Sequence, residues 1–362
     1  MPLKIGYISQ DWSKHNGKHV PNGCTWYRCV VPGRAMGKFG VSTEVGLLAM
    51  TKNNQIGVQR IDGVKVSGFD IIVFKLAMHV SALAAVDKTK GNGQKIVVDI
   101  DDWFDDLPDT NRAKLITDPE RNPLNNRDIY FQIIEIADAL ICSTEFLYEW
   151  YKNKYPHKPV FLVRNAIDSD RWPKYKPPRG RPVIGWMGAT PWRALDLEQL
   201  SPFFGNFIQR NKLTFHHSGH IQKAQHAADL LGVDKSLVTT EPMQPVTNLP
   251  ALMKKFNIGI VPLNNIDFNR AKSYLKGLEY AVAGIPFVAS DMPEYRLLSS
   301  AGVGRVASSP SQWESHMEEL LDFKTRSEDA RLNYEIATSE FSIGLRAKEW
   351  VSVFDEIMEI GN

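Results

Sequence analysis

Residues 268–290 read FNRAKSYLKGLEYAVAGIPFVAS and join a cationic segment to a short apolar run. Lys272, Lys276 and Glu279 stand at positions i, i+4 and i+7, so we expect them to share one face of a helix. The apolar run before this segment, residues 258–263 (IGIVPL), is typical of a buried parallel strand. The sequence therefore predicts a strand that leads into the start of a basic helix.

The cationic segment is predicted to bind a diphosphate. Unpaired backbone N–H groups and the positive end of a helix dipole attract anions, and Arg270, Lys272 and Lys276 add cationic side chains. Glu279, two turns further on, could accept hydrogen bonds from ribose hydroxyls. Charge spacing alone also fits a solvent-exposed basic face on a surface helix, so the assignment depends on its context.

The run Lys-Ser-x-x-Lys-x-Leu-Glu-Tyr, which begins at Lys272 and Ser273, continues through Gly284, Pro286 and Ser290. It resembles the donor-binding motif of family 4 retaining glycosyltransferases. Such enzymes use nucleotide sugars and have two Rossmann-like domains that face each other across a cleft, the GT-B architecture. The family commonly has a first glutamate eight residues before the second, where this chain has Ala271. The resemblance therefore implies that contacts to sugar hydroxyls pass to neighbours such as Asn269 or Lys272, or are absent.

The composition is that of a globular protein of two or three domains, with 362 residues, 43% hydrophobic and 23% charged. Its three cysteines form no C-x-x-C pair, so neither disulfides nor structural zinc are expected, and a reduced, cytoplasmic compartment is predicted. No stretch approaches 18 uninterrupted apolar residues, and the N-terminus lacks the pattern of a signal peptide. We therefore expect neither export nor a membrane span.

Positive charge is concentrated in the first part of the chain. The net charge is only +2, yet residues 1–98 hold 13 Lys or Arg against 5 Asp or Glu, a local balance of 13 − 5 = +8. This imbalance suggests an anionic partner such as nucleic acid, a phospholipid headgroup or a phosphorylated acceptor. Scattered surface lysines explain it equally well, because the charges form no tight run.

Apolar runs alternate with helical patterns, which predicts an α/β fold with parallel sheets covered by helices on both faces. Five runs read as strands of a first domain, at residues 3–9, 70–76, 95–101, 138–143 and 159–165. Five more follow a proline-rich connector (173–182), at residues 181–188, 213–219, 237–242, 258–263 and 285–290. We therefore expect a first domain (1–172), a nucleotide-sugar-binding domain (173–340) and a C-terminal amphipathic helix (341–362), which in the resembling family crosses back to the first domain.

Further donor-site candidates in the second domain follow its predicted strands. Gly188 lets backbone amides approach a ligand closely, and Arg193 is expected to reach the diphosphate. In the resembling family this loop has a further basic residue where Ala189 stands here. The predicted donor-binding set also contains Gly219 in a nucleotide-side loop and Met243 in the base-binding loop, and in full is Gly188, Arg193, Gly219, Met243, Arg270, Lys272, Ser273, Lys276 and Glu279.

The first domain is expected to bind the acceptor. GCTWYRCVVP, residues 23–32, is similar to loops that line the cleft in some family members. Gly23 would allow close approach, Tyr27 would stack on the acceptor and Arg28 would bind an anionic group. A purely structural Tyr-Arg pair on a helix is the alternative.

VVDIDDWFDDLP, residues 97–108, places five aspartates at and just past a strand. Asp-x-Asp could hold Mg²⁺, but we expect no metal, because the cationic helix already offsets the diphosphate charge. By resemblance to the family, Asp101 falls where a histidine often contacts the donor sugar. Asp101 or Asp102 is therefore expected to orient sugar hydroxyls, stabilise positive charge on the ring or accept the proton of the acceptor. Helix N-capping by one of them is the structural alternative.

The predicted function is transfer of a hexose or pentose from a UDP- or GDP-sugar to a hydroxyl acceptor, with retention of configuration. The predicted catalytic residues are Asp101, Asp102, Arg193 and Lys276. The sequence leaves the acceptor open among a modified DNA base, a glycan, a lipid-linked sugar and a protein. A GT-B-like epimerase or phosphorylase, or a non-catalytic nucleotide-sugar-binding module, would use the same cationic wall.

Overall fold

The computed structural model describes residues 2–51, 54–89, 91–173 and 180–360. It divides the chain into two compact units. The first unit contains Met1–Ala166 and Ile343–Asn362, and the second contains Ile167–Ser342. Residues 174–179 of the expected connector lie outside the described residues.

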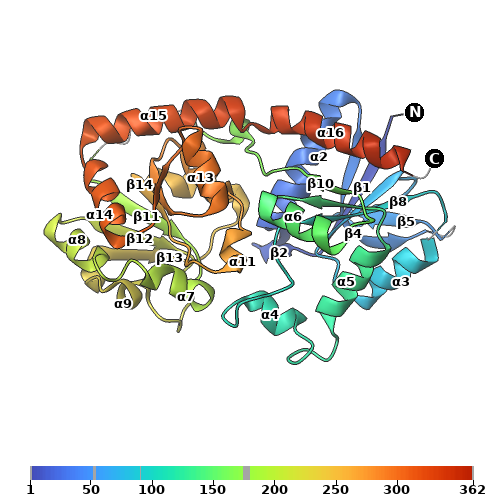
Figure 1. The fold of residues 1–362 in the computed structure, drawn as a ribbon, viewed down its shortest axis with the longest axis horizontal. Coiled ribbons are helices and arrows are strands. Elements are labelled where there is room, and N and C mark those ends of the chain that lie inside the picture. Colours follow the sequence, from blue (N-terminus) through green and yellow to red (C-terminus); the bar gives the residue numbers. More distant parts are fainter. Residues whose placement is uncertain (1, 52–53, 90, 174–179, 361–362) are drawn as a thin grey trace. The chain divides into compact units, whose positions relative to one another are not determined.

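The first unit is built on an eight-stranded sheet with the order β10-β9-β8-β7-β1-β4-β5-β6 (Figure 1). Neighbouring strands from β10 to β4 pair in parallel, whereas β5 and β6 add antiparallel pairs at one edge. The strands are β1 (Lys4–Ser9), β4 (Ser42–Met50), β5 (Ile56–Gln59), β6 (Lys65–Val66), β7 (Ile71–Lys75), β8 (Lys95–Ile100), β9 (Ala139–Cys142) and β10 (Val160–Leu162).

Helices cover both faces of this sheet. They are α1 (Gly23–Thr25), the π-helix η1 (Trp26–Val30), α2 (Val31–Met36), α3 (Val80–Thr89), α4 (Arg112–Thr117), α5 (Asn126–Ile136), α6 (Glu145–Lys154) and α16 (Ile343–Glu359). The predicted C-terminal helix is α16, and its Trp350 and Phe354 pack with Tyr7 and Met36 in the core of the first unit. Because burial on both faces requires apolar residues along most of a strand, β1, β7, β8 and β9 were predictable, and the half-buried edge strand β10 was predicted from its apolar run as well.

The second unit contains a six-stranded parallel sheet with the order β13-β12-β11-β14-β15-β16. Its strands are β11 (Val183–Met187), β12 (Thr214–Ser218), β13 (Val238–Glu241), β14 (Ile258–Val261), β15 (Phe287–Ser290) and β16 (Arg305–Ala307). Its helices are α7 (Thr190–Glu198), α8 (Phe204–Arg210), α9 (Ala227–Leu231), α10 (Leu249–Leu252), α11 (Asp267–Arg270), α12 (Leu275–Val282), α13 (Pro293–Ser300), α14 (Pro310–Glu319) and α15 (Phe323–Glu340). Phe204, Phe207 and Trp313 join α8 and α14 in one core cluster with the sheet.

The strand orders place a topological switch point in each unit. In the second sheet β11 lies between β12 and β14, so the chain extends the sheet in opposite directions from the β11–β14 pair. In the first sheet β1 lies between β4 and β7 in the same way. Open parallel sheets bind ligands outside the carboxyl ends of their strands at such points. We therefore expect ligands to bind at the segments that follow β11 and β14 in the second unit and β1 and β7 in the first.

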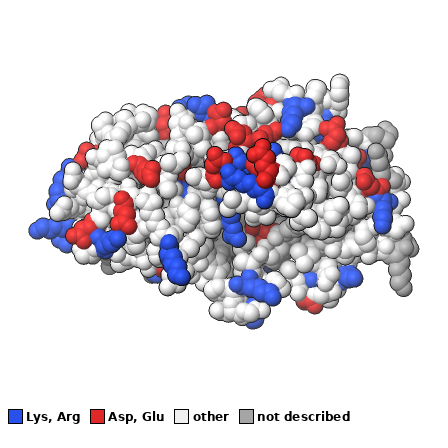
Figure 2. Space-filling view, turned by 90° about the horizontal axis from the view of Figure 1, so that it is seen from below, with Lys and Arg blue, Asp and Glu red and all other residues white. Residues whose placement is uncertain are grey.

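The face of the molecule drawn in Figure 2 carries both positive and negative side chains. On the face displayed in Figure 2, Lys and Arg side chains are interspersed with Asp and Glu. That face carries no extended basic surface of the kind that neutralises many phosphates of a nucleic acid at once.

Candidate functional site

The predicted basic helix is interrupted. α11 ends at Arg270 and α12 begins at Leu275, so Lys272 and Ser273 lie in the connection between two helices. The expectation that Lys272 shares a helical face with Lys276 and Glu279 was therefore wrong, because side-chain periodicity does not reveal a break in the backbone. The break places Lys272 just ahead of the first turn of α12, which has no side-chain N-cap. The positive end of the α12 dipole and a cation thus occur together there.

Lys276 connects α12 to the end of β11. Its ammonium group donates a hydrogen bond to the carbonyl oxygen of Met187 at 2.5 Å. Burial lowers the pKa of Lys276 to about 8, and the nearby positive charge of Arg193 adds to this effect, whereas the carboxylates of Glu279 and Asp196 oppose it. The structure therefore brings three predicted donor-site residues, Lys276, Arg193 and Glu279, into one electrostatic cluster at the switch point of the second sheet.

Arg193 is held in place by Asp196 and Asn269, which the sequence did not connect with it. It has non-helical backbone angles (φ −136°, ψ 17°) inside α7. Its Nη1 donates to Asp196 Oδ2 at 3.1 Å and to Asn269 Oδ1 at 3.4 Å. Asp196 Oδ1 in turn accepts from Asn269 Nδ2 at 2.8 Å and from the backbone N–H of Asn264 at 2.9 Å. Asp196, three residues after Arg193, thus ties the guanidinium to the loop that follows β14.

Gly188 and Gly219 form a close backbone crossing at the ends of β11 and β12. Gly188 N–H donates to Ser218 O at 2.9 Å, and a Cβ at Gly188 would clash with the ring of Trp186. Gly219 has φ +116°, and a Cβ there would clash with the carbonyl oxygen of Gly188. Both positions therefore require glycine, as close approach of backbone to a ligand also would.

His217 hydrogen-bonds to the backbone of Gly188 at this crossing. Burial lowers the pKa of His217 to about 4, so the imidazole is neutral near pH 7. Its Nε2 lies 2.7 Å from Gly188 O and donates to it as the N–H tautomer. Met243, predicted for the base-binding loop, is 57% exposed, and its methyl group lies beside Gly219.

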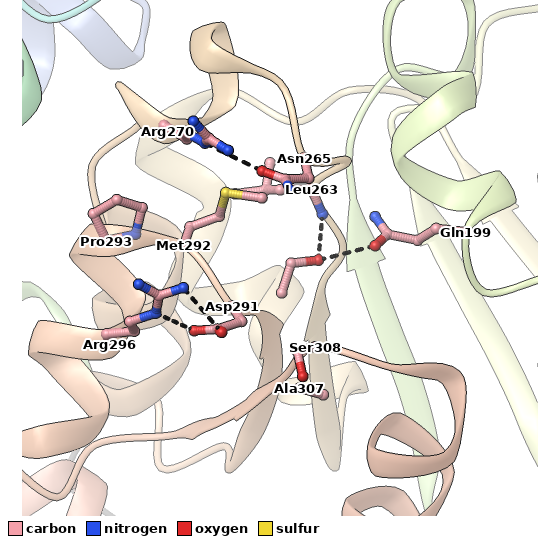
Figure 3. A pocket seen from close by; sticks show the side chains of 11 residues that line it. Gln199, Leu263, Asn265, Arg270, Asp291, Met292, Pro293, Arg296, Ala307 and Ser308 are labelled. Carbon is pink, nitrogen blue, oxygen red and sulfur yellow. Dashed lines mark hydrogen bonds and ion pairs between the residues drawn. The ribbon is translucent and has the colours of Figure 1, made fainter.

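A pocket of about 410 Å³ opens at the carboxyl ends of β14, β15 and β16 (Figure 3). Arg270, which was predicted to belong to the diphosphate cluster, lines this pocket, and its Nε donates to Asn265 Oδ1 at 3.1 Å. Arg296 also lines it and forms a two-pronged ion pair with Asp291 at 2.5 and 3.0 Å. The cations predicted for the donor site are therefore divided, with Arg270 at this pocket and Arg193 and Lys276 in the other cluster.

In the first unit, two of the three predicted acceptor residues lie in the interior. Tyr27 is 4% exposed and Arg28 is 1% exposed, both within the π-helix η1. Arg28 Nε and Nη2 donate to the carboxylate of Asp99 at 2.7 to 3.1 Å, and Nη1 donates to Val163 O at 2.7 Å. These contacts favour the structural alternative for the Tyr-Arg pair. Gly23 is exposed at the start of α1.

The carboxyl ends of β7 and β8 carry a second buried ion network. Lys75 is 1% exposed, and its ammonium contacts Asp101 Oδ1 and lies 3.3 Å from Asp99 Oδ1. Burial alone would lower the pKa of Lys75, but the carboxylates of Asp101 and Asp99 raise it above its usual value. Asp101 itself remains 12% exposed. Sequence reasoning missed Lys75 and Asp99, although a lysine that ends an apolar strand (IIVFK) is a detectable signal.

Asp101 lies close to Cys24 in α1. Burial raises the pKa of the Cys24 thiol, and the negative charges of Asp101, Asp11 and Asp102 raise it further. Asp11 follows β1, and Asp101 and Asp102 follow β8, so three carboxylates gather at the switch point of the first sheet. Both oxygens of Asp11 already accept hydrogen bonds from Asn22, Cys24 and Thr25, so Asp101 and Asp102 are the carboxylates here that suit hydroxyl groups rather than anions.

In the part of the chain that the structure describes, no group of three or more His, Cys, Asp or Glu side chains is arranged to hold a metal ion. None of the described helices combines the length and apolar character needed to cross a lipid bilayer.

Solved structures resemble this chain along nearly its whole length. A glycosyltransferase from Rickettsia africae ESF-5 matches with a TM-score of 0.64 at 10% identity over 99% of both chains. Sucrose-phosphate synthase from Thermosynechococcus elongatus matches with a TM-score of 0.63 at 12% identity, over 98% of this chain and 99% of that one. Anabaena HepE in complex with UDP-glucose also reaches 0.63 at 12% identity, over 98% and 100%. The chain has the GT-B fold.

Sequence comparison adds a partial match. No protein-family model matches the chain. The Bacillus subtilis (strain 168) protein named "Putative teichuronic acid biosynthesis glycosyltransferase TuaH" is 25% identical over 198 residues, which is 51% of this chain. The match spans 48% of TuaH, about half its length.

Proposed function

We propose that this protein is a glycosyltransferase that moves a sugar from a UDP-sugar to a hydroxyl group of an acceptor. The observation that carries the proposal is the closeness of two cations, Lys276 and Arg193, at the switch point of the second sheet. A diphosphate bound there would contact both. The partial similarity to TuaH and the GT-B fold support the reaction class. The choice of UDP over GDP rests on HepE, which was solved with UDP-glucose.

In the proposed mechanism the second unit stabilises the leaving group. Breaking the bond between the sugar and the diphosphate leaves negative charge on the phosphate oxygens. Lys276 and Arg193 are already oriented by Met187 and Asp196, so they stabilise that charge without further reorganisation. Lys272, ahead of α12, adds a third cation, and these cations take the part that a metal ion plays in other diphosphate sites. Glu279, 7% exposed, is proposed to accept from the ribose hydroxyls.

The first unit is proposed to bind the hydroxyl acceptor at the carboxylates near the ends of β1 and β8. Asp101, fixed by Lys75, is proposed to accept a hydrogen bond from the attacking hydroxyl and to take its proton. Attack from the face that the diphosphate leaves would retain the anomeric configuration, as the resemblance to family 4 implies. Asp102 is proposed to orient neighbouring hydroxyls.

The test is an assay with UDP- and GDP-sugars, each offered with neutral glycans, anionic glycans, a lipid-linked sugar and DNA containing hydroxymethylated bases. Mass spectrometry measures the products, and NMR measures the anomeric configuration. Transfer from a UDP-sugar supports the proposal, and loss of transfer in Asp101→Asn but not in the exposed neighbour Asp106→Asn supports the role of Asp101.

Other outcomes identify the alternatives. Conversion of the donor sugar without transfer indicates an epimerase, and phosphate-dependent release of the sugar indicates a phosphorylase. UDP-sugar binding without turnover across all acceptors indicates a non-catalytic module. Each of these three results overturns the proposed transferase.

A further inference from the structure

A β-hairpin absent from the sequence-based expectations follows β1. It consists of β2 (Trp12–His15) and β3 (Lys18–Pro21), which pair in antiparallel register. Asn16 (φ 49°) and Gly17 (φ 76°) form its two-residue turn. Positive φ at both turn residues matches the right-handed twist of the strands, as in tight Asn-Gly hairpins. The tip therefore has a defined shape.

The hairpin exposes four basic side chains. Residues 13–19 are all exposed, and Lys14, His15, Lys18 and His19 have no hydrogen-bond or ion-pair partner on other side chains among the described residues. No acidic residue occurs between Trp12 and Gly23. Lys14 lies opposite His19, and His15 lies opposite Lys18. Since directly opposed residues point to the same face, each face of the hairpin presents one lysine and one histidine.

The base of the hairpin is anchored firmly. Asp11 Oδ1 accepts from Asn22 Nδ2 at 2.9 Å, and Asp11 Oδ2 accepts from the backbone N–H of Cys24 at 3.1 Å. The indole N–H of Trp12 donates to Ser9 O at 2.9 Å. These bonds tie both ends of the hairpin to β1 and to the start of α1. The hairpin is thus fixed to the end of β1 and the start of α1, where Cys24 is also close to Asp101 and Asp102.

Two kinds of polar surface are therefore adjacent in the first unit. The carboxylates of Asp101 and Asp102, which act on Cys24, suit sugar hydroxyls, whereas the hairpin, whose base is tied to Cys24 through Asp11, suits anions. Two lysines are too few for duplex DNA, whose binding typically neutralises several phosphates. A ligand that carries hydroxyl groups and a few spaced negative charges matches both surfaces.

We propose that the hairpin Trp12–Pro21 binds negative groups of the acceptor, and that the acceptor is an anionic glycan whose charges are phosphodiesters or carboxylates. This inference rests on the proposed transferase function and names its acceptor class. The sugar that receives the transferred residue would lie at the carboxylates, and neighbouring charged units of the same chain would lie at the hairpin tip, where Lys14 on one face and Lys18 on the other contact different negative groups.

The test measures binding of the full-length protein to four probes by fluorescence anisotropy. These are a glycerol phosphate oligomer, an oligogalacturonate, a neutral cello-oligosaccharide and a short duplex DNA. The wild-type protein is expected to bind at least one anionic oligomer more tightly than the neutral one, with affinity that falls as salt rises. The anionic oligomer that binds more tightly identifies the charged group of the acceptor as a phosphodiester or a carboxylate.

The test variant is Lys14→Glu/Lys18→Glu, and its matched control is Lys38→Glu/Lys88→Glu, which reverses two exposed lysines elsewhere in the first unit. The hairpin variant is expected to bind the anionic oligomer at least about tenfold more weakly, since two favourable charges become repulsive. Lys14→Arg/Lys18→Arg is expected to keep wild-type affinity. Circular dichroism and thermal unfolding check that each variant is folded.

UDP affinity, measured on the same samples, separates this proposal from the proposed function. Unchanged UDP affinity with weakened glycan binding supports the hairpin assignment. Unchanged glycan binding in Lys14→Glu/Lys18→Glu, or tighter binding of duplex DNA than of either anionic oligomer, overturns it while the donor site stands. Absence of UDP binding in the wild-type protein overturns the proposed function itself.

Discussion

Lys276 lies on α12 and donates to the carbonyl oxygen of Met187 at the end of β11, 2.5 Å away. The bond holds an ammonium group at the carboxyl edge of the second sheet before any ligand binds. A cation placed in this way needs little rearrangement to meet a diphosphate. The first prediction concerns its removal.

Lys276→Met is expected to weaken UDP binding by roughly 10- to 150-fold, because a hydrogen bond to a charged group contributes about 1.5 to 3 kcal/mol. Isothermal titration calorimetry measures the change. Lys324→Met, at an exposed position on α15, is the control and should bind UDP as the wild type does. Equal affinities for Lys276→Met and the wild-type protein would falsify the assignment of this cation.

UDP affinity is also expected to depend on pH. The pKa of Lys276 is lowered to about 8, so the side chain is charged below that pH and loses its charge as pH rises through it. A bound diphosphate favours the ammonium form, so affinity should stay level from pH 7 to about 8 and decline above it. Titrations up to pH 9.5 measure this decline, with proton uptake on binding above pH 8. Lys276→Arg keeps its charge throughout and should lose this dependence; a decline of the same size in that variant contradicts the assignment.

Asp101→Asn is expected to lower kcat by about 100-fold or more while leaving UDP affinity unchanged, because a positioned general base typically contributes 10²- to 10⁴-fold. The two effects separate since Asp101 belongs to the first unit and the proposed donor site to the second. Steady-state kinetics and calorimetry on the same preparation measure both quantities. Asp106→Asn, an exposed aspartate in the same loop, is the control. A variant that keeps full kcat would remove Asp101 from the mechanism.

Arg28→Met is expected to destabilise the first unit by about 3 kcal/mol or more, because it leaves the buried carboxylate of Asp99 without its main partner. Denaturant unfolding measures the loss. Lys75 remains 3.3 Å from Asp99 and limits the effect. Arg34→Met, exposed two turns along the same helical segment, should change the free energy of unfolding by less than about 0.5 kcal/mol. A fully stable Arg28→Met protein that has lost acceptor binding would instead restore the original ligand role of Arg28.

Gly219→Ala is expected to destabilise the second unit by about 1 to 3 kcal/mol and to weaken UDP binding. Its φ of +116° disfavours any side chain, and the added Cβ would clash with Gly188 O. Thermal unfolding and UDP titration measure the two effects. Gly37→Ala is the control, because a Cβ there meets no atom within 4 Å. Wild-type stability in Gly219→Ala would show that this crossing tolerates movement.

Most of the predicted strands are buried along their length, but β10 and β13 were predicted although they are half-exposed edge strands, and β5 was missed although three of its four residues are buried. Ten apolar runs correspond to β1, β7 to β10 and β11 to β15. β4 was missed although it contains the apolar run 45–50, because it begins with the polar residues Ser42, Thr43 and Glu44 and only two of its nine residues are buried. β16 has only three residues, and the hairpin β2–β3 is polar on both sides. Strand prediction from apolar runs thus works best for central strands buried on both faces, and it is unreliable for short strands, edge strands and hairpins.

The site could be predicted as a set of cations, but the partners that orient them could not. Lys276 and Arg193 stand out by motif, whereas the role of Asp196 becomes visible only when α7 meets the loop after β14. Arg28 illustrates the opposite error. Its partner, Asp99, lies 71 residues further along the chain, so no local pattern shows that the guanidinium is already satisfied.

The return of α16 to the first unit bears on the order in which the protein can mature. Tyr7, Met36, Trp350 and Phe354 belong to one core, yet they come from opposite ends of the chain. During synthesis from the N-terminus, residues 167–342 leave the ribosome before α16, which the core of the first unit still lacks at that stage. The second unit can therefore acquire its native packing first, whereas the first unit stays partly uncovered until α16 has been translated.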